Sequence, residues 1–506
     1  MMSLAMSILF SMPNVSQAAG LSCEQAHRAP QISKEQIEKR MDDLIAMGFR
    51  IQLKDFEGDE QLAQAREFFD KEMNLLIAQN PELAKDFRDR WIQARAGLKI
   101  NQKQKSDQNR KRKDEKQKAL NEIELFEPRK FIEIEHTKAV TKALFSSDNR
   151  YVVTTSGQMT LKIYDLKTRT EVRKISHNGV IRSVELSPDG RFVVTASDDS
   201  VATVFDVATG KQVAVIRHQK RSIVSGAKFS LDSHYVVTNS DDGTATIYDL
   251  QNQKEVRTIW AGYAARGAEI SPDGRYVLMT PFRGSTATIY DLNTGVEAGR
   301  IDHGNLIVHA EFSPDGLHVV TASYDHSAKI YDVKARQEVT TIKHPSDVRS
   351  GHFSSDGHYV LTASTGGSVK IYDMQARAQG GELQHGSWIS QALFSPDNRY
   401  VVTIATDGKS VKIFDLKTRA QLGEISHQDK ISGVDFSHEG RFLVTASEDK
   451  TAKIYDLQFH GEIGKIEHQG KVNSVQFSPN DQYVLTASDD QTARVSKLYW
   501  SAGDKL

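Results

Sequence analysis

The feature that most constrains this chain is a unit of about 41 residues that recurs from Arg129 almost to the last residue. Eight histidines mark the units, 41 or 42 residues apart, except for one gap of 85 residues that holds two units and has Trp260 where a histidine is expected. A repeat of this period indicates supersecondary units that bury their apolar faces only by stacking on one another. The marker residues are His136, His177, His218, His303, His344, His385, His427 and His468.

Each unit reads as four short strands separated by turn residues. An apolar stretch ending in Phe-Ser is followed by a turn such as Ser-Pro-Asp-Gly at 187–190, and then by a strand such as Tyr-Val-Val-Thr at 235–238. A further turn leads to a strand such as Ile-Tyr-Asp-Leu at 247–250. Short alternating strands punctuated in this way predict antiparallel sheets. Radial stacking leaves only short protected edges, so the sequence predicts an all-β propeller.

Counting the strands predicts how the ring closes. The ninth unit ends at its third strand, near 495–498, and has no outer strand of its own. A spare segment of that type, 130–135, precedes the first histidine. Pairing it with the last blade predicts nine blades closed by an N-terminal outer strand. Nine exceeds the usual four to eight blades. The alternative, seven or eight blades plus stray repeats, would leave apolar blade faces uncovered.

The unit resembles the WD repeat, with Tyr-Asp or Phe-Asp in place of Trp-Asp, as at 164–165, 205–206 and 414–415. The resemblance covers 129–505 and implies a WD-repeat propeller whose blades each hold a hydrogen-bonded tetrad of His, Ser or Thr, Asp and the aromatic residue. The matching sets are His177, Thr195, Asp199 and Phe205; His218, Thr238, Asp242 and Tyr248; His303, Thr321, Asp325 and Tyr331; and His427, Thr445, Asp449 and Tyr455.

Departures from this pattern identify blades that we expect to be less stable. Phe205 cannot donate a hydrogen bond, and Gln158 and Gly366 stand at the Asp position of units one and six. Units four and seven carry an extra residue in the same turn.

The recurring histidines and aspartates do not predict a metal site. The histidines belong to separate blades and would not converge on one ion. The Asp-Asp-Gly turn at 241–243 lacks the 12-residue loop of a calcium site. Motifs of metalloproteases, serine hydrolases, nucleotide-binding loops and dinucleotide-binding folds are missing from the sequence. We therefore expect a non-enzymatic protein with no catalytic, cofactor-binding or metal-ligating residues.

In WD-repeat propellers, residues just before and at the start of the inner strand often surround the mouth of the ring. Carried over by this resemblance, they form a candidate partner-binding rim, since Trp and Arg are enriched in binding hot spots. The rim residues are Arg182, Arg266, Leu306, Arg349, Trp388, Lys430 and Lys471. The sequence thus predicts an interaction scaffold for a protein or peptide. An enzyme or small-molecule receptor using the centre of the ring, and a structural spacer in an envelope assembly, remain alternatives.

The residues before the propeller differ in kind. Residues 1–19 carry no charge and have a short apolar stretch followed by small residues, which predicts a signal peptide and an exported, periplasmic or cell-envelope protein. A cytoplasmic protein is the alternative. Cys23 is the only cysteine, which excludes an intramolecular disulfide. Residues 31–100 show helical periodicity, and 101–128 read as a charged linker or helix.

Charge and hydropathy exclude some partner classes. The formal net charge is −1, and the basic stretch 101–118 has no aromatic residue for base stacking, so we expect no nucleic-acid partner. The apolar stretch near the start is too short to span a bilayer, so we expect no transmembrane span. The oligomeric state stays open.

Overall fold

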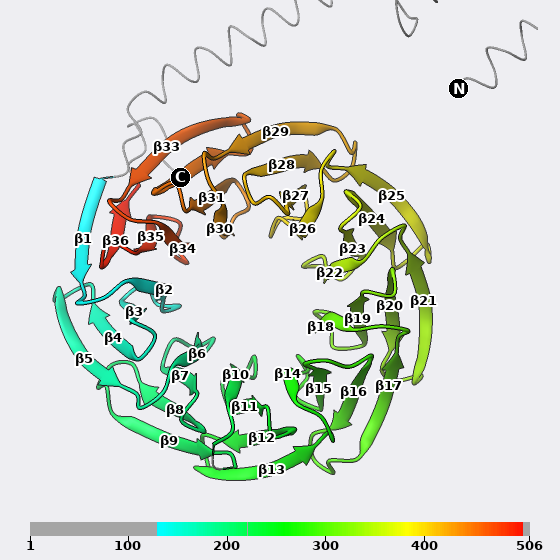
Figure 1. The fold of residues 1–506 in the computed structure, drawn as a ribbon, viewed down its shortest axis with the longest axis horizontal. Coiled ribbons are helices and arrows are strands. Elements are labelled where there is room, and N and C mark those ends of the chain that lie inside the picture. Colours follow the sequence, from blue (N-terminus) through cyan, green and yellow to red (C-terminus); the bar gives the residue numbers. More distant parts are fainter. Residues whose placement is uncertain (1–128, 220, 499–506) are drawn as a thin grey trace, which may run out of the picture. The chain divides into compact units, whose positions relative to one another are not determined.

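The computed structural model describes residues 129–219 and 221–498. These residues form nine four-stranded antiparallel sheets arranged as the blades of one ring (Figure 1). The predicted signal peptide (1–19), helical region (31–100) and charged segment (101–128) lie outside the described residues. No helix in the part of the chain that the structure describes has the length and apolarity to cross a membrane.

Within each blade, the strands follow one another outward from the centre of the ring (Figure 1). The inner strands are β2 (Val140–Phe145), β6 (Ile181–Leu186), β10 (Val224–Phe229), β14 (Ala265–Ile270), β18 (Ile307–Phe312), β22 (Val348–Phe353), β26 (Ile389–Phe394), β30 (Ile431–Phe436) and β34 (Val472–Phe477). The second strands are β3 (Tyr151–Ser156), β7 (Phe192–Ser197), β11 (Tyr235–Ser240), β15 (Tyr276–Pro281), β19 (His318–Ser323), β23 (Tyr359–Ser364), β27 (Tyr400–Ala405), β31 (Phe442–Ser447) and β35 (Tyr483–Ser488).

Two further strands complete each blade. The third strands are β4 (Thr160–Asp165), β8 (Val201–Asp206), β12 (Thr244–Asp249), β16 (Thr286–Asp291), β20 (Ser327–Asp332), β24 (Ser368–Asp373), β28 (Ser410–Asp415), β32 (Thr451–Asp456) and β36 (Thr492–Lys497). The outer strands of blades 1 to 8 are β5 (Thr170–Ser176), β9 (Gln212–Arg217), β13 (Lys254–Trp260), β17 (Glu297–Asp302), β21 (Gln337–Lys343), β25 (Ala378–Gln384), β29 (Gln421–Ser426) and β33 (Gly461–Glu467). The ninth blade takes β1 (Arg129–Glu135) as its outer strand.

The turn after each inner strand explains the recurring Ser-Pro-Asp-Gly sequence. The Ser187 hydroxyl donates to the Asp189 carboxylate at 2.5 Å, and the same carboxylate accepts the backbone N–H of Arg191 at 3.0 Å. The next position, Gly190, has a φ of 74°, in the left-handed region that favours glycine. Every blade has a positive φ at this position, and where Gly is not used the residue is Asn, Ser or Asp.

Apolar clusters fill the interfaces between neighbouring blades. The cluster between blades 1 and 2, for example, joins Ile163 of β4 to Val184 and Val193 of the next blade. Both faces of each sheet are covered in this way, so a closed ring leaves no blade face in water.

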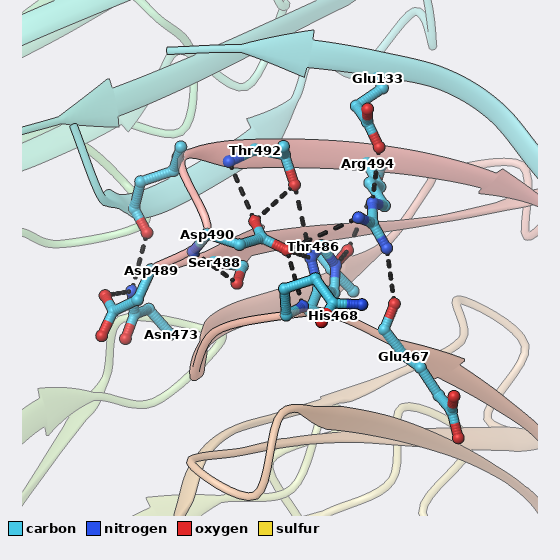
Figure 2. Close-up of polar contacts among 12 residues, drawn as sticks. Glu133, Glu467, His468, Asn473, Thr486, Ser488, Asp489, Asp490, Thr492 and Arg494 are labelled. Atoms are coloured by element: carbon cyan, nitrogen blue, oxygen red, sulfur yellow. Dashed lines mark hydrogen bonds and ion pairs between the residues drawn. The ribbon is translucent and has the colours of Figure 1, made fainter. Parts of the chain in front are cut away.

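The predicted closure is confirmed. Strand β1 pairs antiparallel with β36, with Glu133 opposite Arg494, and their side chains form an ion pair at 2.7 Å (Figure 2). Arg494 also donates to the backbone oxygen of Glu467 at 2.5 Å. On the inner side of the same seam, Phe145 N–H donates to the Gln476 side chain at 2.8 Å. The first and last described segments therefore complete one ring.

Candidate functional site: histidine networks and the loop face

Buried histidine networks occupy most blades, and complete ones lie in blades 5, 8 and 9. In blade 5 the ring of His303 lies between Thr321, with Nε2 and Oγ1 2.8 Å apart, and Asp325, with Nδ1 and Oδ2 2.9 Å apart. In blade 8 the corresponding distances are both 2.8 Å, from His427 to Thr445 and to Asp449.

Electrostatics determine which atom carries the proton in these networks. Burial lowers the pKa of His303 in spite of the neighbouring carboxylate. Burial alone would raise the pKa of Asp325, but hydrogen bonds from Ser327, the Gly304 N–H and His303 hold it at about 2. A neutral imidazole therefore donates its Nδ1–H to an ionised carboxylate and accepts the threonine hydroxyl at Nε2. Each network is a satisfied structural element.

Blades 2 and 3 hold looser versions. The His177 Nδ1 lies 4.0 Å from Asp199 and makes no hydrogen bond to it, while Nε2 is 3.1 Å from the Thr195 hydroxyl. The Asp199 Oδ1 is buried without a hydrogen-bond partner among the described residues.

In blade 3, His218 contacts Thr238 and Thr244, each at 2.8 Å, and its Nδ1 lies 3.7 Å from Asp242. The Asp242 side chain instead accepts the N–H and hydroxyl of Thr244 at 2.9 and 2.6 Å. Here Thr244 stands between the imidazole and the carboxylate.

The aromatic residue implied as the fourth tetrad member has another role in the described blades. Phe205 meets His177 edge-on, with ring centroids 6.4 Å apart. Tyr331 reaches the outer strand of the preceding blade, where a Cβ at Gly299 would lie 2.8 Å from the tyrosine hydroxyl. Tyr455 lies against Gly423 in the same way, and Tyr248 packs into the apolar cluster between blades 2 and 3. These aromatic residues join neighbouring blades, and the network proper is a His–Thr–Asp triad.

The complete triad of blade 9 is missing from the sequence-derived sets. His468 lies 2.7 Å from Thr486 and 2.8 Å from Asp490, and the Thr492 hydroxyl donates to the same carboxylate at 2.6 Å (Figure 2). The spacing of His468, Thr486 and Asp490 in the repeat could have identified this triad. The aromatic position of the same unit is occupied by Ser496, so the unit does not match the full tetrad.

Blades 1 and 6 keep the histidine but lack the triad aspartate, and in blade 7 Asp407 stands at that position without a hydrogen bond to His385. His344 contacts Thr362 at 2.8 Å and Ser368 at 3.2 Å. Burial, with the nearby charge of Lys370, lowers its pKa to about 3. The same causes, with a lysine on the third strand in each case, lower the pKa of His136 and of His385 to about 4.

Blade 4 has no triad. Trp260, which replaces the histidine, is 71% exposed. A cavity of about 320 Å³, lined among others by Tyr263, Thr288 and Arg300, occupies this part of the blade. The Tyr263 hydroxyl lies 3.4 Å from that of Thr288. Blade 4 therefore exposes aromatic surface where other blades bury a polar network.

The predicted rim residues lie on one side of the ring, which we call the loop face. It is formed by the loops that lead into the inner strands and by the turns between second and third strands. In every blade the inner strand contains a β-bulge near its start, and Arg182, Arg266 and Arg349 are bulge residues. A bulge changes the direction of its side chain, which is why these positions reach the loop face.

Three of the basic rim residues are held by neighbours on the ring. Arg182 forms two hydrogen bonds to Asp198, each of 2.6 Å. The Arg349 guanidinium lies over the Tyr324 ring, 4.7 Å from its centroid, and donates to its hydroxyl. Lys471 pairs with Glu448 of the preceding blade.

The other rim residues lack such partners among residues 129–219 and 221–498. The Arg266 and Lys430 side chains are exposed and form no ion pair in this part of the chain, and Leu306 is half-buried. Trp388 is 68% exposed. The structure adds two aromatic residues that the sequence-derived rim did not include, Trp260 and Phe282, the latter 57% exposed in the turn of blade 4.

The inner strands contain a second feature that sequence reasoning missed. At the next-to-last position of the inner strand, several blades carry a carboxylate or amide side chain. It accepts the backbone N–H of the Phe that ends the inner strand of the next blade. Examples are Glu185 to Phe229 at 3.0 Å and Glu311 to Phe353 at 2.8 Å. Next to Glu311 lie two histidines outside the recurring column, His309 and His352, whose ring centroids are 4.6 Å apart. The three side chains offer donor atoms within 4.8 Å of one another.

The fold defines the class of this protein as a β-propeller, and comparisons with known proteins define it further. The family model described as "WD domain, G-beta repeat" matches 129–165, 169–206, 420–456 and 462–495. A second model, the cytochrome D1 heme domain, matches 191–297 and 312–433. The chain is a nine-bladed WD-repeat propeller. None of the curated proteins matches it.

Solved structures support the fold. The computationally designed Ika8 protein is 21% identical, with a TM-score of 0.51, over 73% of this chain and 99% of that one. The C-terminal WD40 domain of Sif2 is 17% identical, with a TM-score of 0.53, over 63% of this chain and 96% of that one. At these identities the likeness concerns the fold alone.

The match to a heme-domain model raises the question of whether the described residues fit a heme. His309 and His352 are directed at each other and at Glu311, an arrangement suited to a small ion shared between them and not to a planar macrocycle. Three cavities among the described residues are lined by other side chains, one by blades 1 and 2, one by blade 4 and one by blades 6 and 7. We therefore assign no heme to these side chains.

Proposed function

We propose that this protein is a non-enzymatic scaffold that binds a protein or peptide on the loop face of the ring. The observation that carries the proposal is the exposure of Trp260, Phe282 and Trp388 on that face. Removing the apolar surface of a large aromatic side chain from water is favourable, so a partner that covers these residues gains binding free energy. Trp is also enriched among the residues that contribute most to binding free energy.

Blade 4 and its neighbour provide the most concentrated part of this surface. The Phe282 N–H donates to the backbone oxygen of Ala264 at 2.8 Å, which places Phe282 beside the start of the inner strand that carries Arg266. Leu306 leads into the next inner strand. An apolar pair with an unpaired arginine favours a partner segment that combines apolar and acidic side chains.

The paired basic residues extend the same surface. Arg182 and Arg349 are fixed by Asp198 and Tyr324, so a partner would meet them in a defined position. Exposed ion pairs contribute only about 0–1 kcal/mol, so exchanging Asp198 for a carboxylate of the partner costs little.

Affinity capture with matched variants tests the proposal. The loop-face variant replaces Trp260 and Trp388 with Ala, and the control replaces Leu231 and Val296, exposed residues of the opposite face. We expect the parent and both variants to have the same melting temperature. The amount of partner captured by the loop-face variant alone should fall by about 30-fold or more, as expected when hot-spot residues are removed. Equal capture by the two variants would refute the assignment of the loop face.

We further propose that the protein is exported and that its partner is in the cell envelope, on the strength of residues 1–19. The capture experiment therefore uses an envelope fraction beside a cytoplasmic one. A small-molecule receptor or enzyme acting at the centre of the ring is the second candidate, favoured by the match to the cytochrome D1 heme domain model. This alternative predicts that the loop-face and control variants both keep ligand binding or activity, whereas substitutions on the inner strands reduce it.

A further inference from the structure

We propose that His309, Glu311 and His352 form a binding site for a divalent transition-metal ion between blades 5 and 6. This site is independent of the loop face. Imidazole nitrogens and a carboxylate oxygen are ligands that Zn²⁺ prefers, and two histidines with one glutamate leave a coordination position open.

The strand geometry brings the three ligands together. His309 and Glu311 are two residues apart on β18, so they share a face of the strand. That face meets blade 6, because Glu311 Oε1 accepts the Phe353 N–H of β22 at 2.8 Å. His352 immediately precedes Phe353 and reaches back, with Nδ1 3.0 Å from Glu311 Oε2. The His309 Nε2 lies 3.9 Å from the same oxygen.

The nitrogens nearest the carboxylate are His309 Nε2 and His352 Nδ1, and the second nitrogen of each ring is not used by the fold. Among the described residues, His309 Nδ1 and His352 Nε2 are buried and have no hydrogen-bond partner. A buried polar atom without a partner costs free energy, so each such atom calls for an explanation. The N–H of Phe353 fixes the carboxylate through one oxygen and leaves Oε2 directed at both imidazoles, as a supporting residue does for a metal ligand.

The neighbouring blades show what the same position looks like without a metal site. There Lys228 pairs with Glu269 at 2.7 Å, and Glu269 accepts the Phe312 N–H at 3.3 Å. The residue corresponding to His309 is Gly267. Blades 3 and 4 thus meet through an ion pair at the strand position that Glu311 and His352 occupy in blades 5 and 6. The addition of a third ligand, the imidazole of His309, distinguishes blades 5 and 6.

Distances and access suit a small ion. Ligands about 2.0–2.2 Å from a shared Zn²⁺ lie at most about 4.4 Å apart. The donor atoms here lie within 4.8 Å of one another, so side-chain movements below roughly 1 Å complete the site. The side chains of His309, Glu311 and His352 remain 28%, 24% and 15% exposed, so dissolved ions reach them.

Zinc binding to the full chain, measured by calorimetry after removal of metal with a chelator, tests the site. His352→Lys places a lysine beside Glu311, as Lys228 stands near Glu185 where blades 2 and 3 meet, and so keeps a favourable contact between blades while removing a ligand. His309→Ala removes a ligand without touching the pair of Glu311 and His352. Glu185→Gln serves as the control. Glu185 also accepts a backbone N–H from the next blade, but it is not part of the proposed metal site.

We expect the parent and Glu185→Gln to bind one Zn²⁺ per chain at this site. Both ligand variants should bind at least about tenfold more weakly, since even loss of a supporting residue typically costs 10–100-fold. Absence of zinc binding in the parent, or unchanged affinity in folded ligand variants, would overturn the proposal. If the variants do not fold, X-ray absorption of the zinc-loaded parent decides: two imidazoles with oxygen ligands support the site, and any other ligand set contradicts it.

Discussion

Acid should destabilise the ring chiefly through the buried histidines of blades 1, 6 and 7. Their pKa values are lowered to about 4 for His136, about 3 for His344 and about 4 for His385. In the unfolded chain the pKa of histidine is about 6.5. The folded protein therefore resists protonation that the unfolded chain accepts, and stability present above pH 6.5 is lost as the pH falls toward 4.

The size of the effect follows from these values. One pKa unit corresponds to about 1.4 kcal/mol, so moving from pH 7 to pH 5 costs about 2 kcal/mol for each histidine and roughly 5 kcal/mol for the three. His309, with a pKa of about 4, adds about 2 kcal/mol to this loss. Asp435, whose pKa burial raises to about 7, takes up a proton in the folded state and offsets a similar amount. The triad aspartates contribute nothing to the loss of stability between pH 7 and pH 5. The pKa values of Asp325 and Asp449 are lowered to about 2, so their contribution is lost only below about pH 4.

Urea unfolding at pH 7 and pH 5, followed by circular dichroism, measures the loss. His344→Gln should reduce the pH-dependent part by about 2 kcal/mol, whereas the exposed His358→Gln should leave it unchanged. Hydrogen exchange should locate the loss in blades 1, 6 and 7. Equal free energies of unfolding at the two pH values, or full pH dependence in His344→Gln, would refute the reasoning.

Three further predictions concern single positions. Asp449→Ala should cost about 1–3 kcal/mol in urea unfolding, because it strips partners from His427, Gln428 and Thr451, whereas Asp199→Ala in blade 2 should cost less. Gly316→Ala, at a φ of 71°, should lower stability by about 1–2 kcal/mol, whereas Gly304→Ala, which has no positive φ, should cost less. The proposed export predicts that mass spectrometry of the protein from its native cells finds a mature N-terminus after Ala18 or Ala19, and an intact Met1 would contradict export by cleavage.

The ring was predictable because its signal repeats nine times. The histidine column, the turn residues and the spare segment at 130–135 together specify blade number and closure, and β1 pairs with β36 as expected. The rim was predictable only in part. Sequence reasoning could not show that Arg182 is held by Asp198 or that Trp260 is exposed, because these depend on the position of each turn relative to its neighbours.

The cluster of His309, Glu311 and His352 could not be predicted from the repeat. The histidines that recur in the repeat are buried one to a blade and so predict no metal site. His309 and His352 lie outside that column and meet only because adjacent inner strands pack with a particular stagger. A comparison of inner-strand positions across units, where His309 replaces Gly267, was the signal available.

A disulfide placed across the seam tests the central claim, a nine-bladed ring closed by β1, most directly. Glu133 and Arg494 are paired across β1 and β36, and their side chains are partly exposed. In a chain with Cys23 replaced by Ser, Glu133→Cys with Arg494→Cys should form one intrachain disulfide on mild oxidation, identified by mass spectrometry of a monomer. Free thiols, or a disulfide between two chains, would contradict the closed nine-bladed ring.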